Sequence, residues 1–270
     1  MKIGIIGVGK MASAIIQGLK QTQHDIIISG SCLERSKEIA ERLDVTYAES
    51  HQSLINQADI IMLGIKPQLF EKVLLPLDIT KPIISMAAGI SLARLSQLTR
   101  SDLPLIRIMP NINAQILQSC TAICYNNHVS DELRQLAKEI TDSFGSSFDI
   151  AETNFDTFTA LAGSSPAYIY LFIEALAKAG VKYGFPKEQA LSIVGQTVLA
   201  SSQNLLQGQN STSDLIDNIC SPGGTTIAGL LDLEKNGLTH SVISAIDATI
   251  EKAKNFEQIA QSFFSYSSLY

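Results

Sequence analysis

Charged side chains are scarce in this chain: Asp, Glu, Lys and Arg together make up 17% of its 270 residues. Low charge is typical of a protein that buries apolar surface between subunits, so we expect self-association. The net charge of -6 comes from scattered acidic residues, and no Lys/Arg cluster forms the basic stripe that nucleic-acid binding requires. We therefore expect no nucleic-acid partner.

Cysteine and histidine are too few and too dispersed for a disulfide framework or a metal site. The four cysteines (Cys32, Cys120, Cys124 and Cys220) lack paired C-x-x-C spacing and the density of a secreted scaffold, which favours reduced thiols in a cytoplasm. The four histidines are spread along the chain, so we expect no metal. Cys220 has no evident base nearby and is interpreted as a packing residue.

Long apolar runs are also missing. Glycines at positions 4, 7 and 9 interrupt the apolar N-terminus, which leaves no signal-peptide core. No run approaches the roughly 20 apolar residues that a membrane helix needs. We expect a soluble, cytoplasmic protein with no membrane partner.

The chain has two halves with different patterns. Short β-branched runs alternate with amphipathic stretches up to about residue 150, which predicts strands at 2–6, 25–28, 60–65, 82–85 and 105–109 in a parallel sheet covered on both faces. Later residues predict helices at roughly 157–183, 186–206, 213–219, 225–235 and 240–263. The predicted fold is an α/β Rossmann-type doubly wound parallel sheet (residues 1–152) followed by an all-α domain (153–270).

A dinucleotide fingerprint follows the first predicted strand. Gly7-Val8-Gly9-Lys10-Met11-Ala12 reads G-x-G-x-x-A and precedes an apolar-periodic helix. Gly7 makes the tight turn, Gly9 lets the backbone approach a pyrophosphate, and small Ala12 lets the helix pack on the strand. The diphosphate is then held at the helix N-terminus.

The end of the second strand bears on coenzyme choice. NAD-preferring sites usually have Asp or Glu there, whereas this chain has Ser29-Gly30-Ser31 with Arg35 nearby. Small hydroxyls and a cation suit a 2′-phosphate, so NADPH is favoured with NADH possible; a simple polar turn is the alternative. Ile65-Lys66-Pro67 and Ala87-Ala88-Gly89 follow later strands at the same sheet edge, although Lys66 is also compatible with a solvated loop.

The second half carries one chemically suggestive loop, Ser221-Pro222-Gly223-Gly224-Thr225-Thr226. Proline and two glycines before a helix give backbone N–H groups that converge at a helix N-terminus, which suits a carboxylate. A tight turn with a threonine cap explains the same residues equally well.

This loop, together with Gly163-Ser164-Ser165-Pro166-Ala167-Tyr168 and Arg107-Ile108-Met109-Pro110-Asn111, closely resembles the pyrroline-5-carboxylate reductase family, from Gly7 to about residue 255. The resemblance implies a Rossmann domain and a helical dimerisation domain, with the substrate pocket where helices from two subunits meet the nicotinamide. It implies NAD(P)H-dependent reduction of the C=N bond of 1-pyrroline-5-carboxylate to L-proline, the last step of proline biosynthesis. The expected partner is a second copy, as a homodimer or a larger oligomer of dimers.

The resemblance also implies site residues. Thr226 is the expected catalytic hydrogen-bond donor to the ring nitrogen. The expected substrate-binding residues are Ser221, Gly223, Gly224, Thr225, Thr226, Asn218 and Glu152. The expected cofactor-binding residues are Ile6, Gly7, Gly9, Lys10, Met11, Ser31, Ile65, Lys66, Pro67, Ala88 and Asn218. For Glu152, an exposed residue at the start of the interdomain helix is the open alternative.

Some residues depart from the family pattern, and the sequence also bears on other functions. Members commonly have Asn or Gln at Lys10, Asn at His51 and Thr-Pro at Ile112-Asn113. A β-hydroxyacid dehydrogenase would need a lysine acid/base motif that Lys178 and Lys182 do not form, and a reductase of another cyclic imine remains open. A catalytically inactive dinucleotide sensor or scaffold with the same fold is the alternative from another functional class. The presence of both the glycine fingerprint and the Ser221–Thr226 loop argues against it, because a scaffold needs neither.

Overall fold

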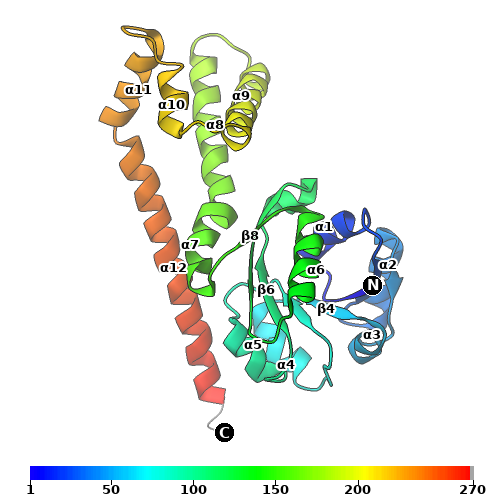
Figure 1. Ribbon diagram of the computed structural model, residues 1–270. Helices are drawn as coiled ribbons and strands as arrows, with labels where there is room; N and C mark the ends of the chain where they lie inside the picture. The colour runs from blue at the N-terminus through cyan, green and yellow to red at the C-terminus, as the bar shows by residue number, and fades with distance from the viewer. Residues whose placement is uncertain (268–270) are drawn as a thin grey trace. The chain divides into compact units, whose positions relative to one another are not determined.

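The computed structural model describes the backbone of residues 1–267 and the side chains of residues 1–254 (Figure 1). Two compact units are present. One comprises residues 1–163 together with the C-terminal residues from Ile250, and the other comprises Ser164–Thr249. We call them the sheet unit and the helical unit. The first break between the units, after residue 163, comes later in the chain than residue 152, the boundary expected from the sequence. The last three residues of the predicted second domain, 268–270, lie outside the described residues.

The sheet unit is built on one sheet that has eight strands in the described chain, in the order β3-β2-β1-β4-β5-β6-β7-β8. Each neighbouring pair is parallel except β6 and β7. The strands are β1 (Lys2–Ile6), β2 (Asp25–Ser29), β3 (Thr46–Tyr47), β4 (Ile60–Leu63), β5 (Ile83–Ser85), β6 (Leu105–Met109), β7 (Ser119–Tyr125) and β8 (Gly145–Asp149).

Helices cover both faces of this sheet. One face packs α1 (Lys10–Leu19), α2 (Leu33–Leu43) and α6 (Asp131–Asp142) against strand side chains such as Ile3, Ile28 and Met62. The other packs α3 (His51–Gln57), α4 (Phe70–Leu74) and α5 (Leu92–Leu98) against residues such as Ile61 and Leu63. Successive residues of a strand point to opposite faces, so the continuous apolar run Ile60–Leu63 fills both cores. The doubly wound Rossmann-type fold is confirmed.

The sequence missed part of the sheet. β3, β7 and β8 were not expected, and β7 runs antiparallel to β6, so the sheet is mixed rather than wholly parallel. β7 reads SCTAICY and β8 reads GSSFD, and both contain small polar residues in place of a β-branched run. β8 is an edge strand with only one neighbour, which explains why it tolerates a polar sequence.

The helical unit continues from a series of short helical turns. η3 (Glu152–Asn154), α7 (Phe155–Phe158) and the π-helix η4 (Thr159–Ser164) lead into α8 (Ser165–Lys182). Gly184, at φ +97°, follows the end of α8. The remaining helices are α9 (Lys187–Gln207), α10 (Thr212–Asp217), α11 (Thr225–Lys235) and α12 (Leu238–Ser267). These bounds match the predicted all-helical half closely.

The helical stretch Glu152–Lys182 is more apolar than expected. By length and composition it is able to span a membrane, with a mean hydropathy of 1.2 and 11% of its most apolar window buried. The expectation that no run approaches that length was therefore wrong, because small and aromatic residues between scattered charges raise the average. Since Glu152 and Phe155 are engaged with the sheet, this stretch is anchored in a folded unit at its start.

Candidate functional site

The turn after β1 has the geometry that a diphosphate requires. Gly7 has φ +83°, which favours glycine, and its N–H donates to the carbonyl of Ser29 at 2.9 Å. Gly9 caps α1 without a side-chain hydrogen bond, and a Cβ added at Gly9 would have no atom within 4 Å. No acidic residue lies in the first turn of α1. The helix N-terminus is therefore open to an anion.

Cations gather beside this turn. A surface pocket of about 660 Å³ is lined by Gly9, Lys10, Ser13, Arg35 and Arg42 among others, and no acidic residue lines it. Arg35 holds Glu38 in a half-exposed ion pair at 2.7 Å. The positive lining adds to the field of the helix N-terminus and favours a phosphorylated ligand.

The other predicted cofactor residues lie at the same edge of the sheet. Ser31 follows β2, Ile65-Lys66-Pro67 follows β4, and Ala88 follows β5. These strands flank β1 in the sheet order, so their carboxyl ends meet at one edge. Lys66 and Ala88 are exposed there. The side chains of Ile6 and Met11 instead pack into or against the two cores, so any ligand contact from Ile6 must come from its backbone.

Glu152 has protein partners in this structure. Its carboxylate lies 2.9 Å from the guanidinium of Arg107 and accepts a 2.8 Å hydrogen bond from the backbone N–H of Leu92. Arg107 is 3% exposed and stacks 4.5 Å above the ring of Phe155. These contacts join the start of the helical stretch to β6 and α5. They give Glu152 a structural role, and its expected contact with substrate stays a prediction.

Burial also alters the thiol and phenol groups on the neighbouring strand. Burial, with a smaller contribution from the Glu152 carboxylate, raises the pKa of Cys124 to about 12. Burial and then nearby Asp149 raise the pKa of Tyr125, whose ring lies 4.4 Å from the guanidinium of Arg134. Both groups are neutral at pH 7, so neither supplies a nucleophile.

Two polar residues on β6 and its end were not predicted as site residues. Arg107 is buried, and Asn111, 5% exposed, donates from Nδ2 to the carbonyl of Ala162 in the π-helix at 2.9 Å. A charged residue within the apolar run Leu105–Met109 was the available signal, since buried charges need partners. The partners themselves lie far along the chain and were not visible locally.

The predicted substrate residues other than Glu152 lie in the segment that precedes and begins α11, in the helical unit. Gly224 caps this helix without a side-chain hydrogen bond, and no acidic residue lies in its first turn. Gly223 has φ +68°, and the N–H of Gly224 donates to the carbonyl of Ser221 at 3.0 Å. Ser221, Thr225 and Thr226 are exposed. Asn218, the C-cap of α10, precedes the loop and is exposed as well.

The geometry of this loop agrees with the anion-binding interpretation in one respect. In a threonine-capped turn, a side-chain oxygen would satisfy a backbone N–H at the helix start, and neither Thr225 nor Thr226 has such a bond among the described residues. The N–H groups at the start of α11 therefore have no side-chain cap, as a carboxylate site requires.

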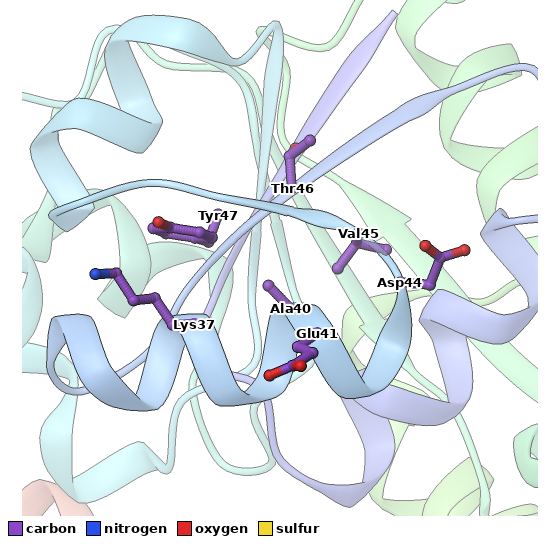
Figure 2. Close-up of a pocket in the computed structure, with 7 residues that line it drawn as sticks. All are labelled: Lys37, Ala40, Glu41, Asp44, Val45, Thr46 and Tyr47. Atoms are coloured by element: carbon purple, nitrogen blue, oxygen red, sulfur yellow. The ribbon is translucent and has the colours of Figure 1, made fainter.

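Another surface pocket lies away from these residues. Figure 2 shows its seven lining side chains, from Lys37 on α2 to Thr46 and Tyr47 on β3. Because α2 starts after β2 and runs back, its last turn lies toward the amino ends of the strands. None of the predicted site residues lines this pocket.

Comparison with known families gives matches in both units. The model for pyrroline-5-carboxylate reductase dimerisation matches residues 152–256. The model for an NADP oxidoreductase, coenzyme F420-dependent, matches residues 2–89.

Relatives match along nearly the whole chain. The pyrroline-5-carboxylate reductase of Aquifex aeolicus is 37% identical over 257 residues, 94% of this chain and 97% of the relative. That of Pisum sativum is 34% identical over 260 residues, 93% of this chain and 94% of the relative.

Solved structures agree with the sequence matches. The 1-pyrroline-5-carboxylate reductase of Streptococcus pyogenes is 70% identical, with a TM-score of 0.87 over 94% of this chain and 98% of that chain. The pyrroline carboxylate reductase of Plasmodium falciparum, solved with NADP bound, is 31% identical, with a TM-score of 0.82 over 95% of this chain and 98% of that chain.

Proposed function

The chain belongs to the pyrroline-5-carboxylate reductase family, and we propose that it reduces the C=N bond of 1-pyrroline-5-carboxylate to form L-proline. It is a nicotinamide-dependent oxidoreductase of proline biosynthesis. The observation that carries the proposal is a pair of helix N-termini, at Gly9 and Gly224, that have no side-chain cap and follow glycine-containing turns. Relatives that match this chain over nearly its whole length are named for this activity. One suits a diphosphate and the other a carboxylate.

The residues of the sheet unit fit a dinucleotide. The open space at Gly9 and the acid-free first turn of α1 accommodate a diphosphate. When bound, the reduced nicotinamide supplies the hydride. Ile65, Lys66, Pro67 and Ala88 would line the rest of the cofactor along the strand ends.

NADPH is the proposed coenzyme. The end of β2 has no carboxylate to hold a ribose 2′-hydroxyl, and Ser31 and Arg35 offer a hydroxyl and a cation instead. Lys10 lines the same basic pocket as Arg35. A 2′-phosphate gains from these charges, whereas NADH does not. The NADP-bound Plasmodium falciparum relative is consistent with this preference.

The loop before α11 is the proposed carboxylate site. The N–H groups of Gly223 and Thr225 and the hydroxyl of Ser221 would bind the substrate carboxylate and fix the position of the ring, whereas the Gly224 N–H already donates to the Ser221 carbonyl. Positioning supplies most of the rate enhancement in such a reaction, because a protonated iminium is already a good hydride acceptor. A Cβ at Gly224 would clash with Ser221, so glycine is needed there.

Thr226 is the proposed catalytic residue. Its side chain is exposed and makes no capping hydrogen bond within the described part of the chain, so its hydroxyl is available to donate to the ring nitrogen. It would orient the substrate or relay a proton, and no shifted pKa is needed for that role.

Self-association follows from the dimerisation domain. We propose a homodimer, or a larger oligomer of dimers, that buries the apolar side chains of the helical unit. All four cysteines are free, which fits the proposed cytoplasmic location.

The test is coenzyme oxidation with 1-pyrroline-5-carboxylate, with a β-keto acid as the carbonyl control. We expect proline formation, and a Thr226→Ala variant should lose about a hundredfold in kcat while its NADPH affinity stays near wild type. Thr225→Ala is the matched control, since it keeps the backbone N–H and should lose much less. Equal loss of coenzyme binding in Thr226→Ala would contradict the assignment, and a folded, NADPH-binding protein without turnover would indicate another imine substrate.

A further inference from the structure

The end of β2 is where a Rossmann fold reads the ribose of its coenzyme. Here that strand ends at Ser29, which is 1% exposed and therefore offers little surface to a ligand. The Ser29 hydroxyl lies 2.7 Å from Nδ1 of His51. His51 is partly exposed, and this contact holds its imidazole beside the end of β2.

Backbone contacts fix this group beside the glycine turn. The Ser29 carbonyl accepts from Gly7 N–H at 2.9 Å, and Gly30 N–H donates to the Ser36 hydroxyl at 2.8 Å. His51 begins α3, whose cap residue Ser50 accepts from the backbone of Ser53 at 3.1 Å. Each element that holds the imidazole is therefore anchored. When Ser29 donates to Nδ1, Nε2 carries the proton and is a donor.

Burial favours the neutral form of this imidazole before a ligand binds. Burial lowers the pKa of His51, and no charged side chain of the described residues contributes to that shift. The first turn of α3 has no acidic or basic residue; along the chain, Glu49 comes just before α3, and Glu34 and Arg35 lie on α2. A phosphate dianion beside the ring would raise that pKa, whereas a ribose hydroxyl would not.

We propose that His51 is a specificity-determining residue that hydrogen-bonds the ribose 2′-substituent and favours NADPH over NADH by taking up a proton beside the 2′-phosphate. The proposal rests on the nicotinamide coenzyme of the proposed function. It adds to Ser31 and Arg35 a group whose charge appears only when the phosphorylated coenzyme is bound. NADPH binding is then coupled to proton uptake, and NADH binding is not.

The experiment is isothermal titration calorimetry of NADPH and NADH without substrate, from about pH 6 to about pH 8, in two buffers of different ionisation enthalpy. It compares wild type with His51→Asn, which keeps a neutral amide donor but cannot take up a proton. His24→Asn is the matched control, because His24 is a histidine of the same unit that pairs with Glu139 instead. The 2′-phosphate itself titrates near pH 6, so the difference between variants is the quantity of interest.

We expect wild type and His24→Asn to bind NADPH more tightly as the pH falls toward 6, with measurable proton uptake. His51→Asn should lose roughly tenfold in NADPH affinity near pH 6, the size expected of a charge-assisted hydrogen bond, with a much smaller change for NADH. Equal losses for both coenzymes, or equal proton uptake by wild type and His51→Asn, would overturn the proposal.

Two further measurements keep the outcomes distinct. Thermal melting of His51→Asn and of His51→Gln shows whether a loss of affinity reflects misfolding. If His51→Asn is unfolded, the same coenzyme titrations are made with His51→Gln. If wild type binds neither coenzyme, the proposed function fails. If it binds both and His51→Asn discriminates as wild type does, only the role of His51 fails.

Discussion

The two units bury their apolar side chains to very different extents. In the sheet unit, strand residues such as Ile3, Ile60 and Leu105 are wholly inaccessible. Within Ser164–Thr249, by contrast, Ala177 and Ala190 are the buried hydrophobic residues that the structure describes. Tyr170, Leu171, Leu206 and Ile219 are each more than 60% exposed. The sheet unit therefore contains its own core, while the helical unit needs another surface to cover its apolar side chains.

This difference explains the composition of the chain. A self-contained α/β unit still needs charges on its surface, and α2 and α6 carry them. Much of the apolar content of the helical unit is placed where a single copy leaves it exposed. Charged residues are sparser in the helical unit than in the sheet unit, which agrees with the dimerisation model that matches residues 152–256.

The largest effect is expected from a charged residue placed among the exposed apolar side chains of the helical unit. Leu171→Asp, at a position 70% exposed, should prevent self-association, because a carboxylate would be buried without a partner. Light scattering after size exclusion should report the monomer mass, and turnover should be lost with it. The control is Leu75→Asp, 64% exposed in the sheet unit, which should keep the wild-type mass. An unchanged mass for Leu171→Asp would remove that face from the interface.

Truncation inside the sheet unit should weaken the protein without changing its assembly. Ile60→Ala, at a wholly buried position, should lower the free energy of unfolding by about 2–5 kcal/mol through lost burial and a cavity. Urea denaturation at fixed protein concentration measures the loss. Leu206→Ala, 84% exposed in one copy, is the counterpart in the helical unit. If Leu206→Ala costs as much at a concentration that holds the protein monomeric, the helical unit has a core of its own.

The ion pair of Arg107 and Glu152 tests the link between sheet and helical stretch. Glu152→Gln should destabilise the protein by about 1–3 kcal/mol, because a buried guanidinium loses its charged partner. Thermal unfolding reports the effect. Asp131→Asn is matched to it, since the Asp131–Arg134 pair is 4.0 Å long and Asp131 is fully exposed, and it should change stability by less than about 1 kcal/mol. Unaltered stability in Glu152→Gln with a raised KM would favour direct substrate contact.

The smallest expected effect concerns thiol reactivity. Because burial raises the pKa of Cys124 to about 12, its reactive thiolate is rare below that pH and grows as the pH rises toward it. Alkylation near pH 8, followed by mass spectrometry, should therefore label exposed Cys32 well before Cys124. Early labelling of Cys124 would mean that the core of the sheet unit opens readily.

Local patterns predicted what local physics decides. β1, β2, β4, β5 and β6 are apolar runs, so these strands were expected at nearly the observed bounds, with amphipathic stretches between them. The glycine turn could be predicted because Gly7 and Gly9 shape the backbone within a few residues of each other. The two-residue strand β3 and the polar strand β8 owe their conformation to their neighbours.

Contacts between residues far apart in the sequence could not be predicted from local patterns. Arg107 meets Glu152, Asn111 meets Ala162, and Ser29 meets His51, each across a sequence separation that no periodicity reveals. Glu152 shows the consequence most clearly. Its position alone favoured neither substrate binding nor an exposed surface role, and the fold gives it a third one as the partner of a buried arginine.

The single reversal of strand direction between β6 and β7 determines the route by which the chain leaves the sheet. Because β7 and β8 run opposite to β1, residues after Asp149 emerge pointing away from the glycine turn. The following segment returns along β6. Arg107, in the middle of that strand, pairs with Glu152, and Asn111, just beyond the strand end, donates a hydrogen bond to the Ala162 carbonyl. That return path places the exit of the sheet unit at the edge where the coenzyme residues lie. With uniform strand polarity, the same segment would have started at that edge.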